Sequence, residues 1–272
     1  MILDLHNDFL TELNKKDIVE YLDKNSSITK GVCAAIWTNQ LINPLKVIKD
    51  RSNLLKNNLK QKYYLCIEDL WFVDKVNINE IIKLKPLYCG LCWNNKNSLC
   101  AGAYSSGGLT LKGKYIIKRL QDDCVMMDTA HMNRQSFYDY AKFTTKPIFC
   151  SHTGFNDVVK DKRNLTKNQL KLIVESSGLV GLYFVGKYIS YNNCSVLDIV
   201  KNIDYFVNNF GIKNLSIGTD FYGTKDLPSG IKNYQDLAKI KQKLANFGYK
   251  NSEIDAIFVN NAKNFIKKEI SY

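Results

Sequence analysis

The sequence predicts one (β/α)8 barrel that occupies the whole chain, residues 1–272. Eight short apolar runs occur along the chain, and stretches with a helical period separate most of them. This repeated alternation of strand and helix is typical of a closed parallel barrel, and 272 residues lie within the size range of that fold. A doubly wound open sheet is the alternative, but no Gly-rich phosphate-binding loop follows the first run. No linker, repeat or low-complexity segment divides the chain.

The eight apolar runs are the predicted strands, at 1–6, 31–37, 63–68, 86–92, 124–130, 146–151, 179–184 and 214–219. The predicted helices carry apolar residues at three- and four-residue spacing. They cover 43–60, 112–121, 134–142, 167–176, 195–210, 234–247 and 252–268. Gly107, Gly108 and Gly113 lie in a loop before a helix and match no nucleotide-binding pattern.

The net charge of +12 comes mainly from lysines spread over the chain. Lysine and arginine total 38 against 26 acidic residues, and arginine occurs only at positions 51, 119, 134 and 163. Nucleic-acid-binding proteins instead concentrate Arg and Lys with exposed aromatics on one face. A solvated surface is therefore favoured over a nucleic-acid interface.

The eight cysteines fall mostly inside the apolar runs, where a free thiol packs as a small hydrophobic group. Cys89 and Cys92 have zinc-knuckle spacing, but no second Cys or His pair follows at a useful distance. The longest uncharged apolar run, 178–186, is too short to cross a bilayer, and the first predicted strand begins without a signal peptide. We therefore expect a cytoplasmic protein with reduced thiols and no membrane partner.

Each of the three histidines ends a short apolar run; they are His6, His131 and His152. In a parallel barrel the carboxyl ends of the strands meet at one mouth, where such barrels place their chemistry. Side chains alternate along a strand, so His6 and Asp8 should point the same way. Three more residues end apolar runs and are expected at the same mouth: Glu68, Trp93 and Asp220.

Three imidazoles and three carboxylates at one mouth predict a metal site. Nitrogen and carboxylate ligands without thiolate suit zinc or another divalent first-row metal. A single catalytic zinc needs three protein ligands, whereas five or six ligands more naturally hold two ions with a bridging carboxylate. A polar strand end with a chance histidine explains any one position, but it explains all three poorly.

Six short motifs follow one another along the chain. They are His6-Asn-Asp8, Gly107-Gly-Leu-Thr-Leu-Lys-Gly113, Asp128-Thr-Ala-His131, Ser151-His152, Lys162-Arg-Asn-Leu165 and Gly218-Thr-Asp-Phe-Tyr-Gly223. In order and rough spacing they resemble the motifs of the zinc-dependent membrane dipeptidases, also called renal-dipeptidase-like peptidases. The resemblance covers nearly the whole chain.

The resemblance implies two zinc ions and hydrolysis of dipeptides by a metal-activated water. His6 and Asp8 would hold the first ion, His131 and His152 the second, and Glu68 would bridge both. Water shared by two zinc ions has a pKa lowered to roughly 7, so a nucleophile exists at neutral pH.

The resemblance also implies groups that act on the substrate. Arg163 looks like the residue that binds the free carboxylate of the peptide, with Tyr188 beside it. Asp220 looks like the acid/base that gives a proton to the leaving amine. Taken alone, an Arg just before a helix is often a surface ion pair, and Tyr188 could serve packing.

The chain departs from the family at three positions that bear on substrate preference. Trp93 stands where some members place a substrate-polarising His, which makes it a candidate substrate-binding residue. Tyr222 replaces an Asp common in the final motif, and Thr153 replaces a Ser after His152. The segments after the first and third strands also look short for the family.

Two other functions compete with dipeptide hydrolysis. Another amidohydrolase reaction, such as deacylation of N-acyl amino acids, could use the same metal site and would leave dipeptides nearly untouched. A non-enzymatic binding protein with a positive surface would not explain why every histidine lies near a carboxylate at a strand end. We expect a small peptide as the partner and no nucleic acid; a homodimer is left open.

Overall fold

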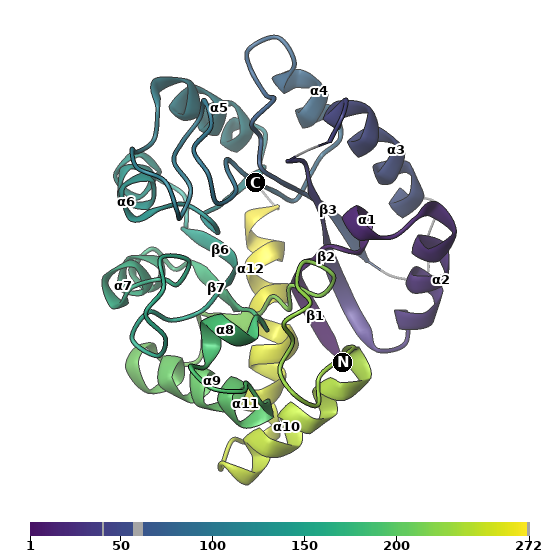
Figure 1. The fold of residues 1–272 in the computed structure, drawn as a ribbon, viewed down its shortest axis with the longest axis vertical. Coiled ribbons are helices and arrows are strands. Elements are labelled where there is room, and N and C mark those ends of the chain that lie inside the picture. The colour runs from purple at the N-terminus through teal and green to yellow at the C-terminus, as the bar shows by residue number, and fades with distance from the viewer. Residues whose placement is uncertain (40, 57–61, 271–272) are drawn as a thin grey trace.

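The computed structural model of the protein describes residues 1–272 except 40, 57–61 and 271–272. Eight parallel strands form one sheet in sequence order, with helices around it (Figure 1). The strands are β1 (Ile2–Asn7), β2 (Thr29–Trp37), β3 (Tyr63–Glu68), β4 (Tyr88–Gly90), β5 (Met126–Asp128), β6 (Phe149–Thr153), β7 (Leu179–Leu182) and β8 (Leu215–Ile217). The predicted (β/α)8 barrel is confirmed, although several strands are shorter than their apolar runs.

The barrel closes where β1 and β8 meet. The Asp220 N–H donates to the His6 carbonyl at 3.1 Å. The buried carboxylate of Asp4 accepts hydrogen bonds from the Thr219 N–H at 2.8 Å and from its hydroxyl at 2.6 Å. These bonds join the first and last strands at their carboxyl ends, so His6 and Asp220 are held side by side.

Most helices pack against the outside of the barrel (Figure 1). They are α1 (Phe9–Glu12), α2 (Lys15–Asn25), α3 (Pro44–Lys56), α4 (Ile78–Lys83), α5 (Leu111–Asp122), α6 (Arg134–Phe143), α7 (Lys167–Glu175), α8 (Gly186–Ile189), α9 (Val196–Phe210), α10 (Leu237–Asn246), α11 (Asn251–Asp255) and α12 (Asn261–Glu269). A 3₁₀ turn, Tyr234–Asp236, precedes α10, and a π-helical segment, Ala256–Asn260, joins α11 to α12.

Two of the helix predictions need correction, and part of a third is not tested. The helix expected at 252–268 is helical throughout, but a π-helical segment divides it into two α-helices. The helix expected at 234–247 starts as a 3₁₀ turn, and the end of the one expected at 43–60 lies outside the described residues. Periodicity does not predict α1, α4 or α8, which have only four to six residues. It also does not predict α2, whose few buried positions lie among charged residues.

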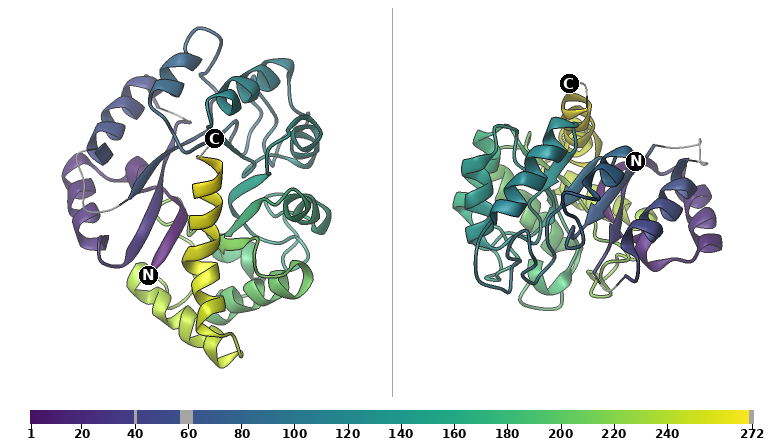
Figure 2. Two further views of the ribbon diagram at one scale, coloured as in Figure 1. Left: turned by 180° about the vertical axis from the view of Figure 1, so that it is seen from behind. Right: turned by 90° about the horizontal axis from the view of Figure 1, so that it is seen from above.

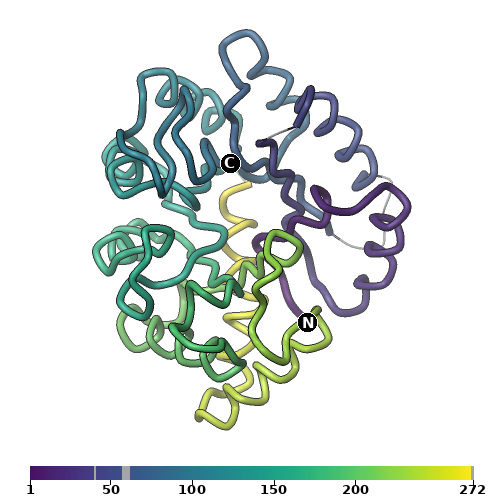
Figure 3. Tube along the Cα trace, in the orientation of Figure 1, coloured from purple at the N-terminus to yellow at the C-terminus, as the bar shows by residue number. Residues whose placement is uncertain are grey.

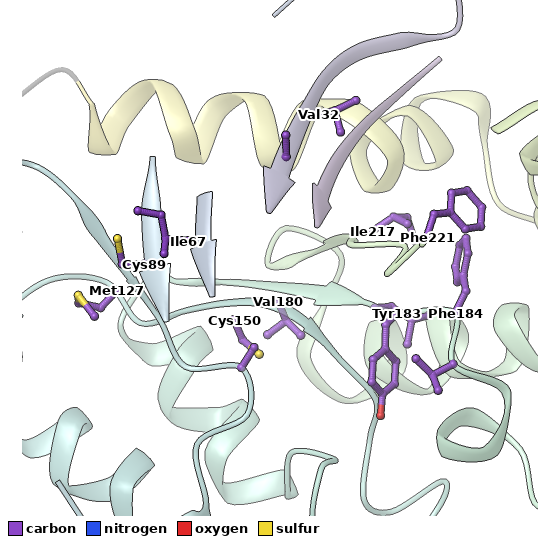
Figure 4. Close-up of a cluster of buried hydrophobic side chains, with 14 of the residues drawn as sticks. Val32, Ile67, Cys89, Met127, Cys150, Val180, Tyr183, Phe184, Ile217 and Phe221 are labelled. Carbon is purple, nitrogen blue, oxygen red and sulfur yellow. The ribbon is translucent and has the colours of Figure 1, made fainter. Parts of the chain in front are cut away.

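Side chains of successive strand residues face opposite sides of the barrel wall. Tyr88 and Phe149 join the cluster inside the barrel, whereas Cys89 and Cys150 face the helices (Figure 4). Helix α12 runs across one end of the barrel (Figure 2), and its Phe265 ring stacks on Phe149 with centroids 5.7 Å apart. In the Cα trace the first strand and the last helix lie side by side near the centre (Figure 3). The interior is thus filled from one end, and the carboxyl end of the strands is left for the site.

The register of two strands is irregular at the positions of His6 and His152. One register shift in β1 brackets His6, and another in β6 brackets His152. Leu5 already faces the barrel interior, so strict alternation would turn His6 outward. Asp8 lies beyond the strand, as the N-cap residue of α1. His6 and Asp8 do meet, but through a local irregularity rather than through the alternation that predicts it.

Candidate metal centre

Five side chains converge at the carboxyl mouth of the barrel: His6, Asp8, Glu68, His131 and His152. Glu68 lies between the others. Its Oε1 is 2.7 Å from His131 Nε2 and 3.9 Å from His152 Nε2. Its Oε2 is 3.8 Å from His6 Nε2, and that nitrogen is 3.1 Å from Asp8 Oδ2. Two groups of three candidate ligands therefore share one carboxylate.

Hydrogen bonds at Nδ1 fix the tautomers of His6 and His131. His6 Nδ1 is 2.8 Å from the Tyr88 hydroxyl, which donates its own proton to the Leu5 carbonyl at 2.9 Å. Because that proton is already used, His6 must donate from Nδ1. His131 Nδ1 is 2.9 Å from the side-chain oxygen of Asn94, which also accepts. A neutral imidazole held this way keeps its Nε2 lone pair free.

His152 is held in the same tautomer. Its Nδ1 is 2.7 Å from the hydroxyl of Ser151, and that hydroxyl donates to the carboxylate of Asp128. The third Nε2 lone pair therefore also faces the centre. Directing the free nitrogen through a bond at the other one is the usual arrangement of metal-binding histidines.

In the centre, atoms that can only accept hydrogen bonds lie next to one another. His131 Nε2 and His152 Nε2 are 2.9 Å apart although the hydrogen bonds leave both with lone pairs. Among the described residues, the buried Glu68 Oε1 atom also makes no hydrogen bond. Buried acceptors without donors cost free energy unless a cation binds them. Nitrogen and carboxylate donors without thiolate fit divalent zinc or a similar first-row ion.

The two sides of the centre differ in charge. Burial lowers the pKa of His6, but the Asp8 and Glu68 carboxylates outweigh burial and raise it to about 10. Burial is the main cause that lowers the pKa of His131 to about 4, and it holds the pKa of His152 well below its ordinary value. At neutral pH the metal-free centre therefore has His6 as a charged imidazolium, whereas the other two imidazoles are neutral.

The carboxylates of the centre also differ in their pKa values. Burial opposes ionisation of Glu68, but the nearby His131 and His6 lower its pKa to about 2. Burial raises the pKa of Asp8, and burial together with the charge of Asp8 raises that of Asp220 well above its ordinary value. The negative charge of Asp8 thus opposes ionisation of its neighbour Asp220. A side chain at Gly223 would clash with both carboxylates, which explains the glycine there.

A cavity of about 310 Å³ opens beside these ligands. Arg163 lines it although its residue is only 5% exposed. The guanidinium donates to the His152 carbonyl at 3.1 Å and lies over the Tyr183 ring, 5.5 Å from its centroid. Tyr188 stacks on the same ring with centroids 5.8 Å apart. The cavity thus has one cationic, aromatic wall.

Trp93 and Trp37 form an aromatic wall of the cavity, with ring centroids 5.0 Å apart. The Trp93 ring also lies 5.9 Å from the His131 ring. Trp93 therefore contacts the metal side of the cavity, as its position at a strand end predicts. An indole can donate one hydrogen bond but cannot carry a proton to or from a substrate.

The family model of the membrane dipeptidases, peptidase family M19, matches residues 39–270. The chain belongs to this family. It is therefore a metallopeptidase of the dipeptidase type. The matched region leaves out His6 and Asp8, which the fold nevertheless brings to the ligands inside that region. Among the described helices, none combines the length and apolar character that crossing a bilayer requires.

Similar proteins support the dipeptidase fold over the whole chain. A Klebsiella pneumoniae protein from the pqqA 5′ region is 29% identical over 185 residues, which are 63% of this chain and 68% of that protein. An amidohydrolase from Pseudomonas aeruginosa is 16% identical with a TM-score of 0.87, covering 99% of this chain and 96% of its own. A metallopeptidase from Rhodobacter sphaeroides, bound to a phosphinate mimic of the dipeptide L-Ala-D-Ala, is 17% identical with a TM-score of 0.79. The match covers 98% of this chain and 99% of that protein's chain.

Every site residue expected from the dipeptidase resemblance lies at this mouth. Tyr188 is also engaged elsewhere, since its hydroxyl is 2.8 Å from the Tyr104 hydroxyl. Of the family departures, Tyr222 is 41% exposed, and the Thr153 hydroxyl donates to the Gly154 carbonyl. Both therefore lie outside the ligand set.

Three residues that support or line the centre are not found from the sequence, Tyr88, Asn94 and Trp37, and Ser151 is found there only as part of a motif, without a role. Asn94 directly follows Trp93 and Ser151 directly precedes His152, so their neighbours could have indicated them. Tyr88 lies inside an apolar run, where nothing distinguishes it from a packing residue.

Proposed function

We propose that this metallopeptidase hydrolyses dipeptides at a centre of two zinc ions bridged by Glu68. The observation that carries the proposal is the division of one carboxylate between two ligand groups. Glu68 Oε1 faces His131 and His152, and Oε2 faces His6, at 2.7–3.9 Å. A buried carboxylate whose two oxygens serve separate imidazole groups is what a bridging ligand requires.

His6 and Asp8 would hold one ion with Glu68, and His131 and His152 the other. When bound, zinc supplies an activated water and polarises the scissile carbonyl. Another divalent first-row metal would find the same donors. The protein's own contribution is to present three Nε2 lone pairs and two carboxylates to one small space.

Asp220 is the proposed acid/base. Burial and the charge of Asp8 raise its pKa, which suits a carboxyl group that takes up a proton and gives it up during the reaction. It lines the cavity beside the ligands, where it can receive the proton of the attacking water. It then passes that proton to the leaving amine.

Arg163 is the proposed binding group for the substrate carboxylate. Among the described residues, no carboxylate forms an ion pair with it within 4 Å, although the residue is buried. A buried guanidinium usually has an anionic partner, and a peptide carboxylate would provide one in two parallel hydrogen bonds. Tyr188 would complete this wall, and Trp93 would contact the substrate beside His131.

The acidic part of the cavity favours dipeptides over N-acyl amino acids. Asp220 and Glu12 line the cavity and are not among the proposed metal ligands. A dipeptide carries a free ammonium group that these carboxylates can attract, whereas an N-acyl amino acid does not. The charge distribution therefore matches a substrate with both ends free.

The test compares one dipeptide with its N-acetyl and C-terminal amide derivatives, together with a panel of N-acyl amino acids. We expect about two equivalents of zinc by elemental analysis and turnover of the free dipeptide. Both blocked forms should be much poorer substrates. Faster turnover of the N-acyl amino acids, or full activity with one ion, would refute the proposal.

A further inference from the structure

One buried hydroxyl lies beneath the histidines of both halves of the centre. Ser151 Oγ is 2.7 Å from His152 Nδ1 and 3.5 Å from His6 Nδ1. The two imidazole rings pack together with centroids 3.7 Å apart. The same oxygen therefore faces both rings from the side opposite the metal-binding nitrogens.

The only proton of this hydroxyl points away from the histidines. It is donated to Asp128 Oδ2, while Asp128 Oδ1 accepts the N–H groups of Ser151 at 2.9 Å and Ala130 at 3.0 Å. Asp128 is 3% exposed and Ser151 is fully buried. Because the carboxylate accepts three hydrogen bonds, the hydroxyl presents only lone pairs to the imidazoles.

We infer that Asp128 is a positioning residue that acts through Ser151 to keep the Nε2 atom of His152 free for a metal ion. A neutral imidazole has one N–H, so donation from Nδ1 to Ser151 leaves the lone pair on Nε2. If the hydroxyl proton turned toward Nδ1 instead, Nε2 would carry the hydrogen and could not bind metal. A carboxylate commonly orients a metal-binding histidine directly; here a hydroxyl stands between them.

Neutral groups hold the other two imidazoles, which provides a matched control. His6 Nδ1 contacts the Tyr88 hydroxyl, and His131 Nδ1 contacts the Asn94 amide oxygen. Removing the charge of Asp128 should therefore affect His152 and leave His131 unchanged. The effect on metal binding rests on the proposed two-ion centre, whereas the tautomer of His152 does not.

The first experiment reads the tautomer in metal-free protein by ¹⁵N NMR of the imidazoles. The chain has only 3 histidines, so the spectrum can be assigned with single substitutions. We expect wild-type His152 to carry its proton on Nδ1. In Asp128→Asn the new amide can donate to Ser151 Oγ and release the hydroxyl proton toward His152, which shifts the population to the Nε2–H form. Ser151→Ala should also lose the preference, and His131 is the internal reference.

The second experiment measures stepwise zinc affinities by competition with a chromophoric chelator. Ser151→Ala and Asp128→Asn should weaken one of the two ions by about 10–100-fold, the usual effect of removing a partner of a metal-binding histidine. Tyr88→Phe should instead weaken the ion held by His6. In a His152→Ala background, Ser151→Ala should cause no further loss, because the residue it acts through is gone.

The inference is overturned if His152 keeps its Nδ1–H tautomer in both variants. It is also overturned if Ser151→Ala causes its full loss of affinity in the His152→Ala background. Wild-type protein that binds fewer than two ions while the tautomer shifts as expected would refute the two-ion centre and support the positioning role. Circular dichroism checks folding, and Ser151→Ala, which removes one oxygen atom, decides the matter if Asp128→Asn does not fold.

Discussion

Zinc binding should release about one proton per chain at neutral pH, and His6 should be its source. The carboxylates around His6 raise its pKa to about 10, so at pH 7.5 it is almost fully protonated without metal. An imidazole must be neutral to bind zinc, so the ion at His6 has to displace this proton. His131, with a pKa of about 4, is already neutral and releases none.

The size of the effect follows from the distance between the working pH and the pKa of about 10. Each unit below that pKa weakens the ion at His6 about tenfold, or about 1.4 kcal/mol. From pH 8 to pH 6 this ion should lose roughly 100-fold in affinity. The ion at His131 and His152 should change far less, since both imidazoles are already deprotonated across this range.

Titration calorimetry of metal-free protein with zinc, in two buffers of different ionisation enthalpy, measures the released protons directly. For one ion the observed heats in the two buffers should differ by about the difference between the two ionisation enthalpies, and for the other ion they should be nearly equal. Heats that are independent of the buffer for both ions would show that His6 is neutral before metal binds. If both ions lost affinity equally between pH 8 and pH 6, the two halves of the centre would not differ in protonation as we infer.

Three substitutions and one stability measurement test the rest. Glu68→Ala should reduce zinc at both positions in elemental analysis; if both ions stay, Glu68 is no bridge. Asp220→Asn should lower kcat by roughly 10²-fold or more with zinc nearly unchanged, and loss of an ion would make Asp220 a ligand instead. Arg163→Met should raise KM for a free dipeptide far more than for its amide, and an equal rise would exclude carboxylate binding. Because burial lowers the pKa of His131 to about 4, unfolded protein binds the proton first as pH falls through 6.5. Urea unfolding of metal-free protein should therefore show about 3 kcal/mol lost between pH 7 and pH 4 from this residue, and stability that is flat over this range would contradict its buried, neutral state.

The barrel could be predicted from the sequence because its strands are buried on both faces and therefore appear as continuous apolar runs. Each metal-ligand candidate follows such a run, so a list of strand ends finds it without any knowledge of distances. The same logic fails for Tyr88, since its hydroxyl is used from within a strand and its ring packs like any core aromatic. It also fails for the π-helical segment at Ala256–Asn260, which has the apolar spacing of an ordinary helix.

Sequence periodicity also predicts correctly that His6 and Asp8 lie close together, but regular alternation is not the reason. Alternation describes regular strands, but β1 is irregular at His6 and ends before Asp8. Tertiary hydrogen bonds accompany the register shift, among them the bond from the Thr219 N–H, more than 200 residues away, to the buried Asp4. A local pattern cannot contain such information.

The irregular backbone of this mouth is where the fold stores strain for the site. His131 and Asp220 both adopt left-handed conformations, with φ of 66° and 60°, although neither is glycine. Such a conformation costs about 1–3 kcal/mol per residue and persists only where surrounding bonds impose it. The His131 carbonyl is held by the Ala103 N–H at 2.8 Å, and the Asp220 N–H is bonded to the His6 carbonyl across the barrel closure. A regular strand end would send these side chains along the wall, whereas the left-handed turn aims one at Glu68 and the other at the cavity. The closure between β1 and β8 is therefore part of the proposed catalytic arrangement, because it holds Asp220 in this turn and His6 at its register shift at once.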